Sequence, residues 1–398
     1  MIDNIQDNTK QLQQLMSSFE YDLQKNVSVY LKRLKNQPMA GVDKGVIRNK
    51  SLQNIQALTN AQYHLKKQYM PLIETSVKYE IARNYDKGVQ LTDKQLSGKS
   101  KKARELTESN RLNKLLEDTR VRIETAINGA IADSIRKYSD TINRALETPR
   151  KTLYAAIDVA RAVVFLAGIQ AVRYKGGGKV SLGGYTSMVT RESSHKSLLV
   201  GEGDRKDDYG KYYVYITGHS ASCPLCRPYQ NKILIDDVNS NGKPDGKHTL
   251  LSEAIANGLF HFNCRHNALP FDLGKDKKPP LAKDISKTRK GNIDNREEAQ
   301  RYKATQRVRA YQNMIRKQKA IRDSALSSNG RQAANERIKL LQGRIRGVES
   351  QSGVKVYRQS WREDAKFKFN KSKPFITQED IDKYNLGELG GRWSQTRL

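Results

Sequence analysis

The stretch IETAINGAIADSIRKYSDTINRAL, residues 123–146, decides the fold class of this chain. Apolar side chains recur in it every three or four residues, which is the spacing of one face of an α-helix. The members of this stripe are Ile123, Ile127, Ile131, Ile135, Tyr138, Ile142 and Leu146. Pro149 ends the pattern, because proline lacks the amide hydrogen that a helix interior needs. We therefore predict a long amphipathic helix over roughly residues 105–147.

Further helical patterns lie on either side of this stripe. Apolar residues at three- and four-residue steps predict one helix in the first 35 residues and another over roughly 50–85. Residues 86–103 are polar and rich in lysine, so we expect a loop there. A further helix is expected from Thr152 to about Val172. Long helices thus dominate the N-terminal part of the chain.

The middle of the chain has a different texture. Glycines separate short β-like pieces over residues 174–272, and the run YYVYI at 212–216 has the β-branched and aromatic residues of a strand. We predict a compact α+β module with few, short strands. The expected fold is mainly α, with long N-terminal helices, this small zinc-knuckle module and a basic C-terminal helical arm. The expected regions are 1–172, 173–274 and 275–398.

The composition indicates a polyanion partner and argues against a membrane protein. The formal net charge is +30, and only 37% of the residues are hydrophobic, so the chain repels itself unless polyanions are near. The longest apolar run, Ala162–Ile169, is eight residues, whereas a membrane span needs roughly 20. Three cysteines make no disulfide framework, so we expect synthesis in a reducing cytoplasm.

The cysteines and histidines form the most specific local signal. All three cysteines and four of the six histidines lie between residues 219 and 266. Cys223 and Cys226 have the C-x2-C spacing of a zinc knuckle, and His261 and Cys264 form an H-x2-C pair. His266 could replace either member of that second pair. Thiolate and imidazole ligands select zinc over magnesium or calcium, so we predict a structural zinc site that holds the module together.

Two other interpretations of this cluster stay open. The three thiols could be free or buried, with unrelated surface histidines. Alternatively, the segment His261–His266 could serve a metal-dependent nuclease, with Glu253 as general base. Against catalysis, the same residues are needed as metal ligands, and the sequence has no second carboxylate cluster.

The chain turns helical again from about residue 295 to 351 and becomes strongly basic. Between residues 301 and 346, thirteen Lys and Arg stand against two acidic residues. A solvated helix face normally mixes the two signs, whereas such an excess can neutralise phosphates and release counterions. We predict nonspecific, salt-sensitive contact with nucleic acid through Arg307, Arg309, Arg316, Lys317, Lys319 and Arg322. Packing of these helices against other parts of the protein or a partner subunit is the alternative.

Several segments resemble the phage minor capsid protein 2 group of tailed bacteriophages. The most specific is FNCRHNALPF, residues 262–271. The others are AVRYKGGGKV at 171–180, YTSMVTR at 185–191, GHSA at 218–221, YQNK at 229–232 and the basic stretches 302–319 and 337–348. The cysteine pattern is also similar to that of the related Mu F-like head morphogenesis proteins. Those read C-x2-C and then H-x2-C-R-C, with His266 here in place of the last cysteine, which leaves the fourth ligand open between His261 and His266.

The resemblance implies a non-enzymatic virion protein, synthesised in the bacterial host cytoplasm and placed in the capsid near the portal. Portal and other head proteins and viral DNA would be its partners, in head assembly and in DNA packaging or delivery, with no small-molecule substrate. A nonspecific nucleic-acid-binding protein outside the particle is a further alternative to the nuclease.

Overall fold

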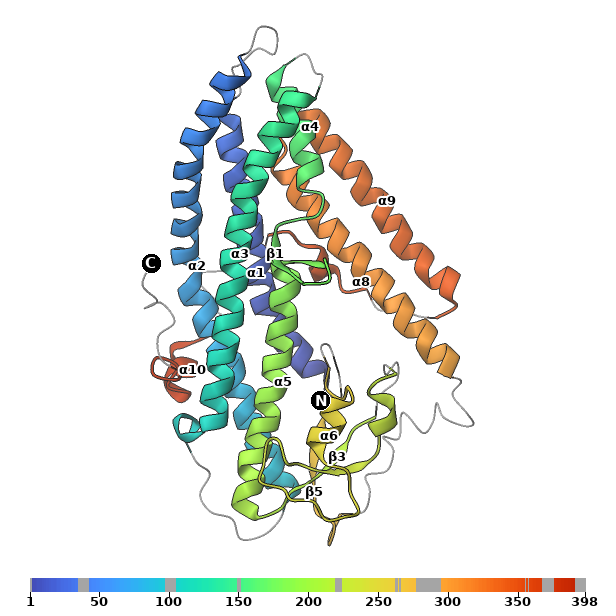
Figure 1. The fold of residues 1–398 in the computed structure, drawn as a ribbon. Coiled ribbons are helices and arrows are strands. Elements are labelled where there is room, and N and C mark those ends of the chain that lie inside the picture. The colour runs from blue at the N-terminus through green and yellow to red at the C-terminus, as the bar shows by residue number, and fades with distance from the viewer. Residues whose placement is uncertain are drawn as a thin grey trace.

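A computed structural model gives the architecture of the chain. It describes residues 2–34, 43–96, 105–148, 152–218, 224–261, 264, 266–276, 295–354, 356, 358–366 and 376–390. The described chain is mainly helical and carries a few short strands (Figure 1). None of the helices in these ranges combines the length and the apolar character needed to cross a membrane.

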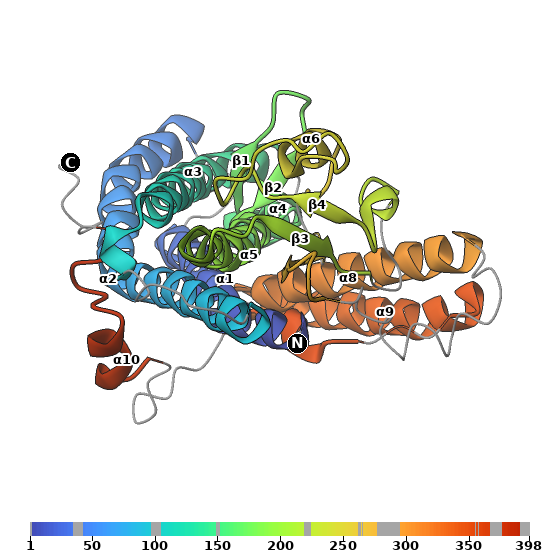
Figure 2. The ribbon, with the colours of Figure 1, turned by 90° about the horizontal axis from the view of Figure 1, so that it is seen from below.

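Four long helices form the body of the molecule. They are α1 (Ile2–Lys32), α2 (Lys44–Gln95), α3 (Asn110–Glu147) and α5 (Leu182–Tyr209). Helix α5 contacts the other three, and Figure 2 shows it lying among them. The short helix α4 (Leu153–Val164) packs against α3. We call α1, α2, α3, α4 and α5 the bundle.

The apolar stripe of residues 123–146 lies in α3 and faces the core of the bundle. Ile123, Ile127, Ile131, Tyr138 and Ile142 are all buried, as the helical spacing predicted. The helix begins where the Ser109 side chain accepts a hydrogen bond from the Leu112 amide, which satisfies one of the free amides of the first turn.

Helices α2 and α5 pack closely against each other within the bundle. A Cβ atom on Gly201 would collide with the carbonyl oxygen of Tyr85, and one on Gly88 with that of Leu198. The Thr92 hydroxyl donates to the Gly88 carbonyl oxygen at 3.0 Å. The missing side chains therefore allow the two backbones to touch.

The described strands form two small antiparallel sheets. Strands β1 (Gln170–Arg173) and β2 (Lys179–Ser181) make a hairpin beside α3. Strands β3 (Tyr213–Ile216), β4 (Ile233–Ile235) and β5 (Ala268–Phe271) form the second sheet, in the order β4-β3-β5. Helix α6 (Leu251–Ala256) and the 3-10 turn η2 (Arg227–Tyr229) complete this part, which we call the sheet module and define as residues 211–276.

The described chain resumes at residue 295 with a helical hairpin. Helices α8 (Asn295–Asp323) and α9 (Ser328–Ser352) pack along each other around their own apolar cluster and extend away from the bundle (Figure 1). The fully buried Arg161 of α4 ties the turn of the hairpin to the bundle, because it donates to Asp158 at 3.2 Å and to the Ser324 hydroxyl at 2.8 Å.

The last described segments return to the bundle and the hairpin. The turn η3 (Ser360–Glu363) contacts α8, and the short helix α10 (Gln378–Lys383) precedes a turn whose Tyr384, Leu386 and Leu389 join the core of the bundle. A further 3-10 turn, η1 (Leu106–Glu108), leads into α3.

Three elements differ from the sequence-based expectation. Helix α2 continues through residues 86–95, where a loop was expected, because Gly88 and Thr92 pack against α5. The helix expected over 152–172 ends at Val164, since Gly168 turns the chain with φ +73° into β1. The 28-residue helix α5 lies where short strands were expected.

Candidate metal centre and basic helices

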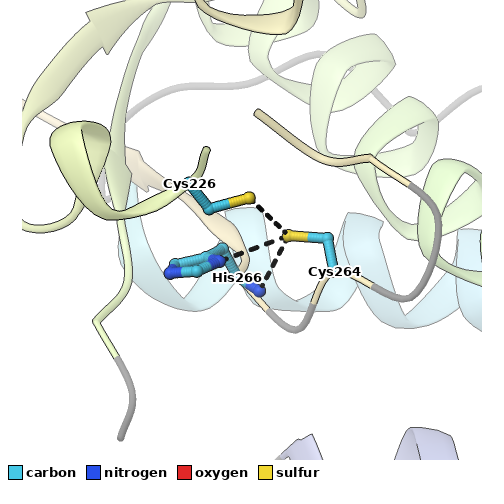
Figure 3. A group of neighbouring side chains, drawn as sticks. All are labelled: Cys226, Cys264 and His266. Atoms are coloured by element: carbon cyan, nitrogen blue, oxygen red, sulfur yellow. Dashed lines mark hydrogen bonds between the residues drawn. The ribbon is translucent and has the colours of Figure 1, made fainter. Parts of the chain in front are cut away.

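The sheet module brings two cysteines and one histidine together. Cys226 ends the turn before η2, while Cys264 and His266 lie just before β5. The three side chains point toward one another (Figure 3). Cys226 and His266 are 0% and 1% exposed, and Cys264 is half-buried.

The distances within this group match those of a metal site. The Cys226 and Cys264 sulfurs are 3.5 Å apart, and the Cys264 sulfur lies 3.2 Å from Nδ1 of His266. In a tetrahedral zinc site two thiolate sulfurs stand about 3.8 Å apart and a sulfur and an imidazole nitrogen about 3.5 Å apart. Within the described ranges, these three residues are the one group of Cys, His, Asp or Glu with such spacing. They could hold a metal ion.

The protonation state of Cys226 would make metal binding at this group dependent on pH. The hydrogen bond between the Cys226 and Cys264 sulfurs and burial together raise the pKa of the Cys226 thiol to about 12, although His266 acts in the opposite direction. With protein groups alone, Cys226 is therefore a neutral thiol at pH 7. A divalent cation bound between the two sulfurs would stabilise the thiolates, so metal uptake would release protons.

The other sequence-predicted ligands have different placements. Cys223, like His219, lies outside the described residues. His261 is described and lies beside the same cavity, but it is not a member of the three-residue group. Glu253, the general base of the nuclease alternative, is an exposed residue of α6 and also lies outside that group.

A cavity of about 800 Å³ adjoins the group and separates the sheet module from the bundle. Cys264 and His266 line it together with apolar side chains of α5 such as Leu198 and Leu199. His195, also in the lining, packs edge-to-face on Phe260, and burial lowers its pKa to about 4. His195 is therefore a neutral packing residue; sequence spacing placed it far from the cysteine cluster, so its position here was not predictable.

The six predicted nucleic-acid-binding residues all lie on α8 but differ in exposure. Arg307 is exposed, and its guanidinium donates to Gln351 of α9 at 3.4 Å. Arg309, which lines the cavity, is partly buried. Arg316 donates to the Ser17 hydroxyl of α1 at 2.8 Å, and burial lowers the pKa of the neighbouring Lys317.

The last two of the six are paired with acids. Lys319 lies 3.2 Å from Asp364, and Arg322 lies 2.7 Å from Asp323. Much of the positive charge on the second half of α8 is thus directed at other parts of the same chain.

The comparisons with known proteins agree with one another. The family model for phage minor capsid protein 2 matches residues 3–348, which is most of the chain. A curated relative from Lactococcus phage LL-H, described as a structural protein, is 23% identical over 233 residues. That match covers 55% of this chain and 59% of the relative, so this chain spans less than two thirds of that protein. No solved structure matches.

Proposed function

Because this chain belongs to the phage minor capsid protein 2 family, we propose that it is a non-catalytic structural protein of the phage head that acts at the portal vertex. In this proposal the protein is made in the host cytoplasm, joins the portal and other head proteins, and remains in the virion. It contacts viral DNA through phosphates and serves in DNA packaging or delivery. The long bundle helices supply extended surfaces for partner proteins.

The observation that carries the non-catalytic proposal is the burial and ligand chemistry of the cysteine and histidine group. Catalytic zinc keeps one position open for water or substrate, whereas structural zinc is enclosed by four protein ligands, most often thiolates and imidazoles. Cys226 and His266 are buried, and Cys264 between them is only partly exposed. We propose that Cys223 is the fourth ligand, since the C-x2-C spacing from Cys226 suits one ion. His261 is the alternative ligand, because its pairing with Cys264 also has metal-site spacing.

We also propose that the three regions have separate roles. Region 1–172 serves in head assembly, region 173–274 is stabilised by a bound metal, and region 275–398 contacts nucleic acid. Separate apolar clusters in the sheet module and in the α8–α9 hairpin support this division. Helix α5 contributes to the cores of both the bundle and the sheet module, through Val189 and Leu199 respectively. We retain Arg307, Arg309, Arg316, Lys317, Lys319 and Arg322 as proposed phosphate contacts.

A metal-dependent nuclease remains the second candidate, and the cavity beside His266 favours it, since a substrate would need such a space. Two measurements on one preparation of the purified protein distinguish the structural protein from the nuclease. We expect one zinc ion per chain by elemental analysis and no cleavage of supercoiled or linear DNA with added Mg²⁺, Mn²⁺ or Zn²⁺. Cleavage that disappears in both His266→Ala and Glu253→Ala would instead establish the nuclease.

The placement in the particle needs its own experiment. Purified phage particles that contain this protein are treated with a lysine-reactive crosslinker, and the crosslinked peptides are identified by mass spectrometry. We expect crosslinks from the bundle to the portal protein. Crosslinks confined to the major capsid protein, or absence of the chain from the particles, would contradict the proposed placement.

A further inference from the structure

Helix α9 carries a set of exposed cations that the sequence-based choice of residues did not include. They are Arg331, Arg337, Lys339, Arg344 and Arg346. In the part of the chain that the structure describes, none of the five side chains forms an ion pair or a hydrogen bond. Cations of the bundle, such as Arg111 with Asp204 and Arg205 with Asp93, are paired.

Four of the five residues form two ridges along the exposed side of α9. Seven residues bring an α-helix back to nearly the same face about 10 Å further along its axis. Arg337 and Arg344 share one ridge by this spacing, and Lys339 and Arg346 share the other. The buried stripe, with Ile338 and Ile345 among its members, faces α8. Both ridges therefore flank the side of α9 that faces away from α8.

The strip of helix surface between the two ridges has no protruding side chain at its two glycines. It contains Leu340, which is 59% exposed, and the glycines at 343 and 347, where an added Cβ would meet only the ends of flexible side chains. Glu336 also lies on this strip, and its carboxylate accepts a hydrogen bond from Gln332 at 3.2 Å. Phosphates can therefore approach the helix most closely beside the two glycines, between the ridges and away from the Glu336 carboxylate.

Helix α8 extends this surface at its far end. Arg307 lies beside the C-terminal end of α9 through its hydrogen bond with Gln351, and Lys303, one turn earlier on α8, is exposed as well. By contrast, Arg316 and Lys317 on the second half of α8 face α1, where Ser17 and Glu20 lie. The accessible positive charge of the hairpin is thus concentrated on α9 and on the first half of α8.

We propose that the exposed face of α9, with Lys303 and Arg307 of α8, is the surface that contacts the phosphate backbone of nucleic acid. This inference rests on the proposed function and moves its principal contact from the second half of α8 to α9. Exposed cations without internal partners keep their full charge for a polyanion, and their binding is driven by counterion release rather than by base recognition.

The test compares two variants with the same change in net charge. In the first, Arg337, Lys339, Arg344 and Arg346 are replaced by Gln. In the control, Lys44, Arg48, Lys50 and Lys67, which are exposed on α2, are replaced by Gln. Binding to a fluorescent 30-base-pair duplex is measured by anisotropy over a range of salt concentrations, after thermal melting has shown that both variants are folded.

We expect the α9 variant to bind at least tenfold more weakly, with the slope of log affinity against log salt shallower by about three to four, because each phosphate contact contributes about 0.9 to that slope. The α2 variant should retain most of the wild-type slope. Equal losses in the two variants would mean that net charge alone attracts the duplex and would overturn the α9 surface. A wild-type protein that does not bind the duplex would overturn the proposed DNA contact itself.

The second measurement separates nucleic acid from an acidic protein as the occupant. Leu340, between the ridges, is replaced by a diazirine-bearing amino acid, and particles that contain this variant are irradiated. A nuclease-sensitive adduct is expected. An adduct that survives nuclease and contains a head-protein peptide would assign this face to a protein partner and overturn the proposal.

Discussion

The bundle and the sheet module are stabilised in different ways. The bundle buries a continuous apolar core drawn from all of its helices, together with the turn that follows α10. The sheet module has only a small cluster of buried apolar residues. We propose that the Cys226, Cys264 and His266 group and the Lys206–Asp236 ion pair supply much of its remaining stability. A domain that buries little apolar area needs a bound metal, a disulfide or buried ion pairs for its stability, whereas a domain with a large apolar core does not.

Metal removal gives the sharpest contrast between the two regions. Chelation should unfold the sheet module and leave the bundle helical, because structural zinc contributes on the order of 10 kcal/mol in small zinc-binding domains. Limited proteolysis with mass spectrometry measures this, and Cys226→Ala should reproduce it without chelator. Restored protection on addition of Zn²⁺ is the control. A module that stays resistant to protease after complete metal removal would refute this stabilisation by the metal.

The close contact between α2 and α5 allows the packing of the bundle to be tested by substitution. Gly201→Ala should lower the free energy of unfolding by more than about 3 kcal/mol, because the new methyl group meets the Tyr85 carbonyl and the helices must separate. Gly176→Ala is the matched control, since open space surrounds that position. Denaturant unfolding followed by circular dichroism measures both variants. Similar free energies of unfolding for the two variants would mean that α2 and α5 can move apart without loss of stability.

The joint between the two regions should show an intermediate effect. Lys206 of α5 and Asp236 of the sheet module are each 1% exposed and form an ion pair. Lys206→Met leaves the Asp236 carboxylate buried without its cation and should cost about 3 kcal/mol. Lys196→Met, on the same helix but in an exposed pair with Glu192, should cost less than about 1 kcal/mol. Equal costs in denaturant unfolding would show that the buried pair does not hold the joint.

The bundle also contains an acid that opposes its stability at high pH. Burial raises the pKa of Glu80 from 4.5 to about 7. Between these values the folded chain holds the proton and the unfolded chain releases it, so stability falls as the pH rises and levels off above about 7. Glu80→Gln should therefore gain about 2 kcal/mol at pH 8 and almost nothing at pH 4, as measured by denaturant unfolding.

A second buried acid and a control variant help to interpret the Glu80→Gln experiment. Burial also raises the pKa of Glu202 well above 4.5, so a residual pH dependence of the same sign should persist in the variant. The exposed Glu253→Gln is the control and should change nothing. A gain that is the same at pH 4 and pH 8 would show that Glu80 is not the titrating group.

Apolar periodicity predicted the helices that have apolar stripes and missed the one that does not. The stripe of α3 was visible because large aliphatic or aromatic side chains recur at helical spacing along its buried face, from Ile123 to Leu146. The buried face of α5 instead carries small residues such as Ser193, Ser197 and Gly201, which look like loop residues when only hydrophobicity is counted. Their role, close backbone approach, depends on a partner helix more than 100 residues away, so the local pattern carries no sign of it.

The candidate site was predictable in its chemistry but only partly in its geometry. C-x2-C and H-x2-C-x-H spacings brought Cys226, Cys264 and His266 into one predicted set, and the structure brings these three together. Charge counting found the basic hairpin, but it could not tell the cations of α8 that face α1 from the cations of α9 that face solvent. That distinction depends on how the two helices rotate against the bundle.

The hairpin is also joined to α1 across the length of the chain, and this has a consequence for synthesis. Gln24 of α1 donates to Ser324, 300 residues later, and Asp22 pairs with Lys366. At a translation rate of about 5–20 residues per second, α1 leaves the ribosome about 15–60 s before these partners do. These polar groups of α1 therefore lack these partners for most of the chain's own translation, and the hairpin can dock on α1 only after the rest of the bundle has been synthesised.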